Sequence, residues 1–203
     1  MPVPNLHLTA LELTHSLTQP EIDAIVSNLG APAAETMTDY TYSHRARLIK
    51  PMLSYDGAAL ALSFLPAAGE LLPPSSSDSA QTTGKGRIQS DDKFTYHHLR
   101  RDLFNIARKT GVSVDSRYVV PSSHITVARF LTQDDHDSPE KMKKWIEKIE
   151  SMNAALEREY WPKDGGKRNE DGEWIVGQER GLDFREGTLW YGGGNTIRIG
   201  KGF

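Results

Sequence analysis

Two short stretches, His7-Leu8-Thr9 and His124-Ile125-Thr126, decide how this chain is interpreted, because each places a histidine two residues before a threonine. The residues around them, 6–13 and 124–131, are largely apolar and favour β structure. Side chains alternate between the two faces of a strand. We therefore expect each histidine and its threonine to project from one face, with the aliphatic residue between them turned into the core.

The tripeptide alone is weak support, and its surroundings strengthen it. With seven histidines and thirty Ser or Thr residues among 203, about one His-x-Ser/Thr match is expected by chance. A third match, His136-Asp137-Ser138, lies in an acidic run and is interpreted as an exposed loop followed by a helix cap. The other two copies are each followed by a loop and a helical pattern that starts at Pro20 or Pro139, 13 and 15 residues after the histidine. Repetition of this whole unit favours a functional pair.

Two such units, brought together, would surround one small space with two imidazoles and two hydroxyls, which suits a tetrahedral anion such as phosphate. Histidine as a residue type titrates near neutral pH, so one ring can accept a proton while the other donates one. Threonine hydroxyls can donate hydrogen bonds to oxygens on which negative charge develops. The predicted catalytic residues are His7, Thr9, His124 and Thr126, and this chemistry requires neither a metal nor a cofactor.

Length, charge and composition limit the function classes. A chain of 203 residues predicts a single domain over 1–203, and the formal charge of −3 argues against unspecific coating of nucleic acid. There is no cysteine, hence no disulfide and no thiolate site. No apolar run approaches the roughly 20 residues that a bilayer span needs, and the N-terminus, Met1-Pro2-Val3-Pro4, lacks the charged and apolar regions of a signal peptide. We expect a monomer in the cytoplasm or nucleus without a membrane partner.

Periodicity predicts an α+β fold with two similar sheet-and-helix lobes. A short helix should end at Gly30, before a loop over 31–40, and an Asp-Gly turn near residue 56 should join two strands. Residues 67–92 are rich in Pro, Ser and Gly and are predicted to be a disordered insert. Further helices are expected at 92–110 and around 142–156, and strands at 6–13, 45–53, 58–65, 118–120, 124–131, 174–176, 188–191 and 196–199.

Four aromatic residues are candidates to stack on a base in a binding site: Tyr55, Tyr118, Trp190 and Tyr191. Arg129 is odd in parity from His124, so we expect it to face away from the histidine and to form a surface salt bridge.

A small basic cluster precedes the strand at 45–53 and consists of His44, Arg45 and Arg47. Two interpretations are open: these side chains line a phosphate pocket, or they form a solvated strand edge.

With both motifs placed, the chain resembles the 2H phosphoesterase superfamily, whose members carry two His-x-Thr/Ser motifs on the central strands of two pseudo-symmetric lobes. Residues 121–130, Pro-Ser-Ser-His-Ile-Thr-Val-Ala-Arg-Phe, look like the second motif of the RNA 2′,3′-cyclic phosphodiesterases. The predicted helix before this motif, with Leu99-Arg100-Arg101 and a following Gly111, also resembles the sequences of that subgroup. The resemblance covers residues 6–160.

The resemblance implies two antiparallel sheets with helices on their outer faces and a central cleft between them. It also implies metal-independent hydrolysis of 2′,3′-cyclic phosphates on RNA 3′ ends or small cyclic nucleotides. The chain departs from the family in the separation of the two histidines, which are 117 positions apart, and in the place of a strand before the first motif, where only Met1 to Asn5 are present. Either the C-terminal strands fill that edge or a strand precedes residue 1 in the native protein.

Other functions use the same residues. A 2′,5′-oligonucleotide phosphodiesterase and a 3′-end RNA exonuclease would keep the site and change the substrate. A nucleotide- or RNA-binding module would keep the surface without turnover. The sequence leaves open the natural substrate, the regiochemistry of the product and which histidine is the acid.

Overall fold

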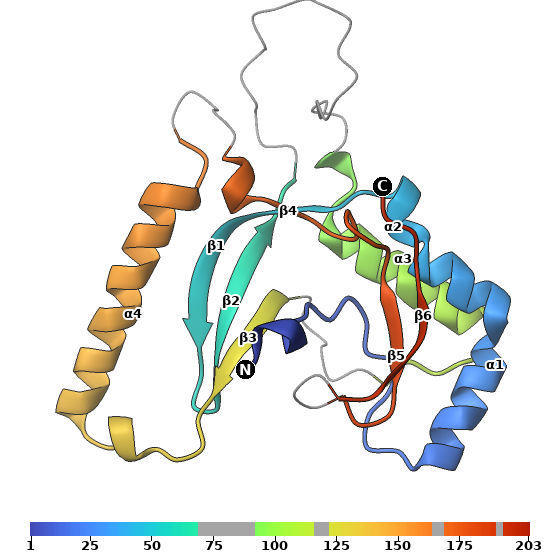
Figure 1. Ribbon diagram of the computed structural model, residues 1–203, viewed down its shortest axis with the longest axis horizontal. Coiled ribbons are helices and arrows are strands. Elements are labelled where there is room, and N and C mark those ends of the chain that lie inside the picture. Colours follow the sequence, from blue (N-terminus) through green and yellow to red (C-terminus); the bar gives the residue numbers. More distant parts are fainter. Residues whose placement is uncertain (69–91, 116–121, 164–168, 190–192) are drawn as a thin grey trace, which may run out of the picture.

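The computed structural model describes residues 1–68, 92–115, 122–163, 169–189 and 193–203. They form an α+β structure in which a curled antiparallel sheet stands between helix α4 and a second group of helices and strands (Figure 1). In chain order the elements are η1 (Val3–Asn5), α1 (Gln19–Thr38), α2 (Tyr40–Ser43), β1 (Arg47–Tyr55), β2 (Ala59–Pro66), α3 (Tyr96–Lys109), β3 (Ser123–Arg129), η3 (Asp134–His136), α4 (Pro139–Tyr160), η4 (Glu170–Gly172), β4 (Trp174–Ile175), β5 (Asp183–Glu186) and β6 (Asn195–Ile199).

The main sheet has the strand order β3-β2-β1-β4, and all its neighbours are antiparallel. The β1–β2 turn is the one that the Asp-Gly pair predicts. The Oδ1 atom of Asp56 accepts hydrogen bonds from the N–H groups of Ala58 and Ala59, at 2.7 and 2.8 Å. These two bonds hold the pKa of the Asp56 carboxyl below its usual value.

Two irregularities bend this sheet. In β1 the pairing with β2 shifts between Ile49 and Met52, and Lys50 has a positive φ of 54°. In β3 the pairs Ala61–Thr126 and Leu60–Ala128 leave Val127 as an extra residue. In both places one strand has one residue more than its partner. Such a β-bulge bends the strand and increases its twist.

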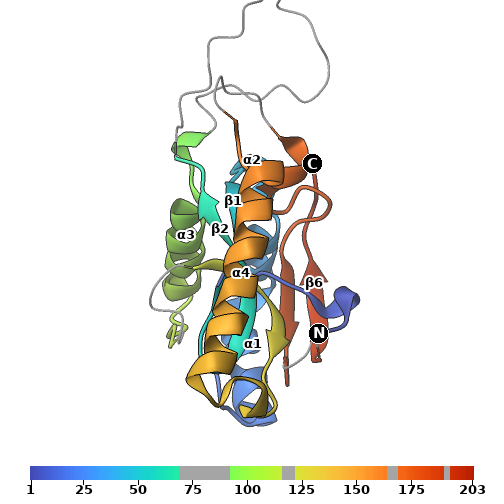
Figure 2. The same ribbon diagram turned by 90° about the vertical axis from the view of Figure 1, so that its left-hand side faces the viewer.

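Helix α4 begins at the predicted Ser138 cap, whose hydroxyl accepts from the N–H of Lys141 at 3.3 Å. The helix lies in front of the sheet in Figure 2 and covers the outer edge of β1. There the Asn153 side chain pairs with the backbone N–H and C=O of Leu53, at 2.7 and 3.0 Å. Because β4 pairs only with the first residues of β1, α4 side chains satisfy backbone groups that would otherwise form a free edge.

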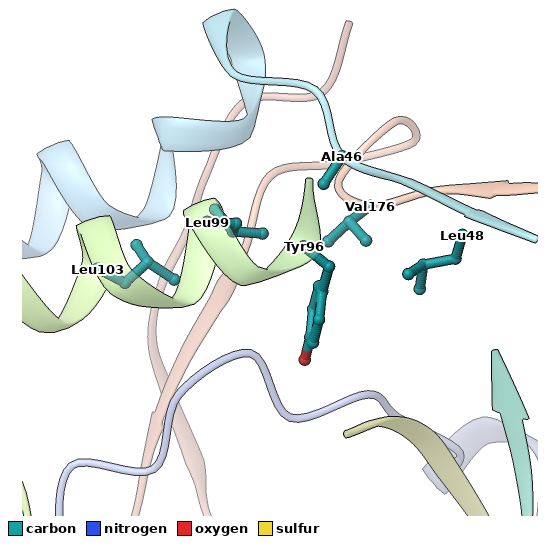
Figure 3. Close-up of a cluster of buried hydrophobic side chains, with 6 residues drawn as sticks. All are labelled: Ala46, Leu48, Tyr96, Leu99, Leu103 and Val176. Atoms are coloured by element: carbon teal, nitrogen blue, oxygen red, sulfur yellow. The ribbon is translucent and has the colours of Figure 1, made fainter. Parts of the chain in front are cut away.

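The main core lies where α3 meets the start of β1 and the residues around β4. Its buried members are Ala46, Leu48, Tyr96, Leu99, Leu103 and Val176 (Figure 3). A second core joins α1 to α3 and has the buried members Leu29, Ala34, Ala107 and Val112. Helix α3 contributes buried side chains to both cores.

Two predictions near the N-terminus are wrong in detail. Residues 6–13 do not form a regular strand; Leu8 alone makes an isolated bridge. Gly30 does end the predicted short helix, because its φ of 73° is non-helical, but a second helical segment follows at once and the label α1 covers both. Pro32 fits the first turn of the helical segment that follows, since its ring restricts φ to helical values and its missing N–H has no helical partner there. The predicted loop at 31–40 is therefore largely helical.

At the C-terminal end, β4 and β6 are confirmed, whereas the predicted strand at 188–191 is not formed at 188–189. The hairpin partner of β6 is instead β5, which the sequence patterns did not indicate. Residues 118–120 and 190–191 lie outside the described ranges, as do residues 69–91 of the predicted insert. Ala67 and Asp92, at the two ends of that insert, are both buried.

The α+β class is confirmed. The expected pair of matched lobes is not confirmed in the described ranges, which hold one four-stranded and one two-stranded sheet. Among the described helices, none is both long and apolar enough to cross a membrane.

A buried cation ties β1 to two distant loops. Arg47 is 3% exposed, and its guanidinium donates to Asp92 at 2.6 and 3.1 Å and to Glu173 at 2.7 Å. Burial by itself would lower the pKa of Arg47, but the bonds and charges of the two carboxylates outweigh burial and raise the pKa. Arg47 therefore neither lines a phosphate pocket nor lies on a solvated strand edge, the two interpretations of the basic cluster. It forms structural ion pairs.

Replacing Arg47 with methionine should leave two buried carboxylates without their cation. We expect Arg47→Met to lower the free energy of unfolding by about 3–5 kcal/mol, measured by urea denaturation. The control is Arg101→Met at an exposed pair with Asp102, where the loss should stay within about 1 kcal/mol. An Arg47→Met midpoint equal to that of Arg101→Met would contradict this prediction.

Candidate functional site

The two His-x-Thr motifs, motif 1 (His7-Leu8-Thr9) and motif 2 (His124-Ile125-Thr126), meet in the structure through their central residues. Leu8 and Ile125 form an antiparallel bridge, although they are 117 positions apart in the sequence. In antiparallel pairing, the residues before and after such a bridge are opposed in reverse order. If this pairing is continued by one residue in each direction, each histidine is opposite the threonine of the other motif, and the two histidines are diagonal neighbours.

The apolar residues around the motifs identify the buried face. Ile125 lines a cavity of about 430 Å³ together with Leu62 and Phe64 of β2 and residues of α4. Leu8 packs against the main core, as Phe64 does. By the alternation of strand side chains, His124 and Thr126 belong to the other face of β3. This part of the expectation, with aliphatic residues turned inward, agrees with the structure.

His7 is exposed, and its orientation is set locally. Its Nδ1 lies 2.9 Å from the carbonyl oxygen of Asn5. A carbonyl can only accept, so Nδ1 is the donor and carries the hydrogen in this contact. The Nε2 atom of a neutral His7 then holds the lone pair that a proton acceptor needs.

Thr9 is held from the side by α3. Its carbonyl oxygen accepts a hydrogen bond from the Tyr96 hydroxyl at 2.8 Å and a longer one from Arg100 Nη1 at 3.4 Å. Both donors are buried, at 0% and 9% exposure. Helix side chains thus occupy the flank of motif 1 on which a further strand would pair in a regular sheet.

His124 stands beside a small-residue row of β2. Its partner across the sheet is Ser63, and the hydroxyls of Ser63 and Ser54 are 2.5 Å apart. Ala61 is the partner of Thr126 on the same face. Sequence reasoning missed Ser63, but the alternation of Ala and Ser with Leu and Phe along β2 was a signal that this face is not packed like the other one.

The bulge at Val127 overturns the expectation for Arg129. Beyond the bulge, Arg129 pairs with Ala59, whereas Thr126 pairs with Ala61. Ala59 and Ala61 share a face of β2, so Arg129 lies on the face of Thr126 and not on the opposite one. It is exposed near the β1–β2 turn, where its charge helps to lower the pKa of Asp56.

Of the four aromatic candidates, only Tyr55 lies in the described ranges, and it packs against helix α4. Tyr55 is 44% exposed and makes an edge contact with Trp145 of α4, at a ring-centroid distance of 4.3 Å. Its partner across the sheet is Leu60, which shares the α4 side with Leu62. Tyr118, Trp190 and Tyr191 lie outside the described ranges.

The rest of the basic cluster is divided between two contacts. His44 stacks on Tyr40 with a ring-centroid distance of 4.1 Å, and Arg45 lies over the Phe203 ring at 4.2 Å. Within the described ranges there is also no group of three or more His, Asp or Glu side chains arranged to hold a metal ion.

Compared with known proteins, the chain matches no family model, no curated protein and no solved structure.

The Leu8–Ile125 bridge can be tested by cross-linking, because the chain has no cysteine of its own. Directly opposed residues in antiparallel strands have Cα atoms about 4.5–5.5 Å apart, which suits a disulfide. We expect the Leu8→Cys/Ile125→Cys double variant to oxidise to an intramolecular disulfide, detected by mass spectrometry of the non-reduced protein.

The matched control is Leu8→Cys/Leu62→Cys. Leu62 pairs with Ile125 on its other side and so lies two strand spacings, roughly 10 Å, from Leu8. It should not cross-link within the same chain. Equal cross-linking of both pairs, or of neither, would show that Leu8 does not pair with Ile125.

Proposed function

We propose that this protein is a metal-independent phosphodiesterase that hydrolyses 2′,3′-cyclic phosphates of RNA 3′ ends or small nucleotides. The observation that carries the proposal is the bridge between the central residues of the two motifs. Diagonal neighbours across an antiparallel pair lie about 7–8 Å apart, a span that two imidazoles can bring to either side of one phosphate. The resemblance to the 2H phosphoesterases supplies the substrate class.

In the proposed reaction, water attacks the phosphorus and one ribose oxygen leaves from the opposite side. One histidine, neutral, takes a proton from the water as the new P–O bond forms. The other, protonated, gives its proton to the ribose oxygen as the old P–O bond breaks. The proton count balances, and the histidine pair ends with its protonation states exchanged. Because Nδ1 of His7 is engaged with the carbonyl oxygen of Asn5, Nε2 is the His7 atom that would transfer the proton.

The two threonines complete the proposed site. Their hydroxyls belong to the faces of His7 and His124 and would donate hydrogen bonds to the non-bridging phosphate oxygens as charge builds on them. Continued by one residue on each side, the Leu8–Ile125 bridge would set each histidine opposite the threonine of the other motif, which gives the proposed site local two-fold character. The bilobal fold with a central cleft, the monomeric state and a place in the cytoplasm or nucleus belong to the same proposal.

Replacing either histidine should abolish most of the turnover. We expect His7→Ala and His124→Ala each to lower kcat on nucleoside 2′,3′-cyclic phosphates by ~10²–10⁴-fold, because each removes one proton-transfer group. The measurement is product formation by chromatography, with excess chelator present. His136→Ala, in the third His-x-Ser match, is the matched control and should retain wild-type kcat. Wild-type kcat in His7→Ala or His124→Ala would refute the proposal.

A substrate panel separates the alternatives that share the site. Turnover of 2′,5′-linked oligonucleotides in preference to cyclic phosphates would favour a 2′,5′-phosphodiesterase, and stepwise shortening of RNA would favour a 3′-end exonuclease. Tight nucleotide binding without any product across a broad pH range would favour a binding module.

A further inference from the structure

Motif 1 is supported by side chains of helix α3 as well as by its bridge to β3. Residues 6–13 have no regular strand pairing, and Leu8 is their single bridge residue to β3. On the α3 flank, the Tyr96 hydroxyl donates to the carbonyl oxygen of Thr9 at 2.8 Å, with Arg100 as a longer second donor at 3.4 Å. Figure 3 shows the Tyr96 ring reaching down from α3 with its hydroxyl toward the N-terminal segment.

The Tyr96 ring has little freedom to move. It is fully buried in the main core, together with Leu48 of β1 and Leu99 of α3. Burial also raises the pKa of its hydroxyl, so the group stays protonated and remains a donor around neutral pH. The end of this rigid side chain is therefore a fixed point for the backbone at Thr9.

We propose that Tyr96 is a positioning residue for catalysis, with its hydroxyl setting the place of motif 1 relative to motif 2. The inference rests on the proposed phosphodiesterase function. Tyr96 acts through the Thr9 backbone, which carries the Thr9 hydroxyl and the neighbouring His7 imidazole. It does not touch the substrate.

The expected effect follows from the geometry of proton transfer. Without the hydroxyl, the Thr9 carbonyl oxygen loses the shorter of these two hydrogen bonds, and the longer one from Arg100 Nη1 remains. A displacement of about 1 Å in a reacting group can cost about 10²-fold in rate. Binding of the substrate depends less sharply on such a shift than the chemical step does.

The test is Tyr96→Phe, which removes one oxygen and keeps the ring in the core. We expect kcat on a nucleoside 2′,3′-cyclic phosphate to fall about 10–100-fold, with KM changed less than about threefold. Rates should be measured at a temperature where circular dichroism shows the variant to be fully folded. The matched control is Tyr40→Phe, which removes a similar hydroxyl bond to α3, from Tyr40 to Asp102 at 3.0 Å, away from motif 1. It should keep wild-type kcat and KM.

A double variant distinguishes positioning from loss of folded protein. In a Thr9→Ala background, Tyr96→Phe should lower kcat by a smaller factor than in the wild type, because part of its effect passes through the Thr9 hydroxyl. Loss of folded protein would lower kcat by the same factor in both backgrounds.

The outcomes separate the two proposals. Wild-type kcat in Tyr96→Phe, an equal loss in Tyr40→Phe, or equal factors in the two backgrounds would overturn the positioning role and leave the proposed function standing. A wild-type protein without turnover on any cyclic phosphate would overturn the function, and the role of Tyr96 in catalysis with it.

Discussion

The buried Arg47 guanidinium is the constraint on which the arrangement around the site depends. It joins β1 to Asp92, shortly before α3, and to Glu173, directly before β4. Three segments distant in sequence must meet for this cation to be neutralised, because an unpaired charge in the interior is strongly unfavourable. The ion pairs thereby bring the start of α3 against the sheet, where Tyr96 enters the main core.

Two contacts connect Tyr96 in the main core to the two motifs. Tyr96 holds the Thr9 backbone, and Leu8 bridges to Ile125. Motif 2 lies in β3, a paired strand of the sheet, whereas motif 1 lies in an irregular segment. The site thus joins one half supported by strand pairing to one half supported by side chains of a helix. This asymmetry differs from the two equal lobes that the repeated sequence pattern suggests.

Strong local signals were confirmed where one physical effect dominates. The helical periodicity around residues 142–156 and the Ser138 cap predicted helix α4, and the Asp-Gly pair predicted the turn between β1 and β2. Gly30 interrupts the helix as expected, but the loop predicted after it is wrong, because Pro32 is compatible with the first turn of a new helical segment. The segment at 6–13 misled because its apolar pattern shows burial but not whether a strand or a helix covers it.

The sequence by itself determined helix α4, the β1–β2 turn, the α+β class and the paired His-x-Thr motifs, since these depend on local periodicity and residue type. Only the tertiary structure decided that Leu8 meets Ile125, that Tyr96 reaches Thr9 and that Arg47 is buried rather than solvated. It also decided the face of Arg129, because one extra residue in β3 reverses the alternation beyond it. Contacts of this kind join residues far apart in the chain, and no local pattern carries the register or the partner that they depend on.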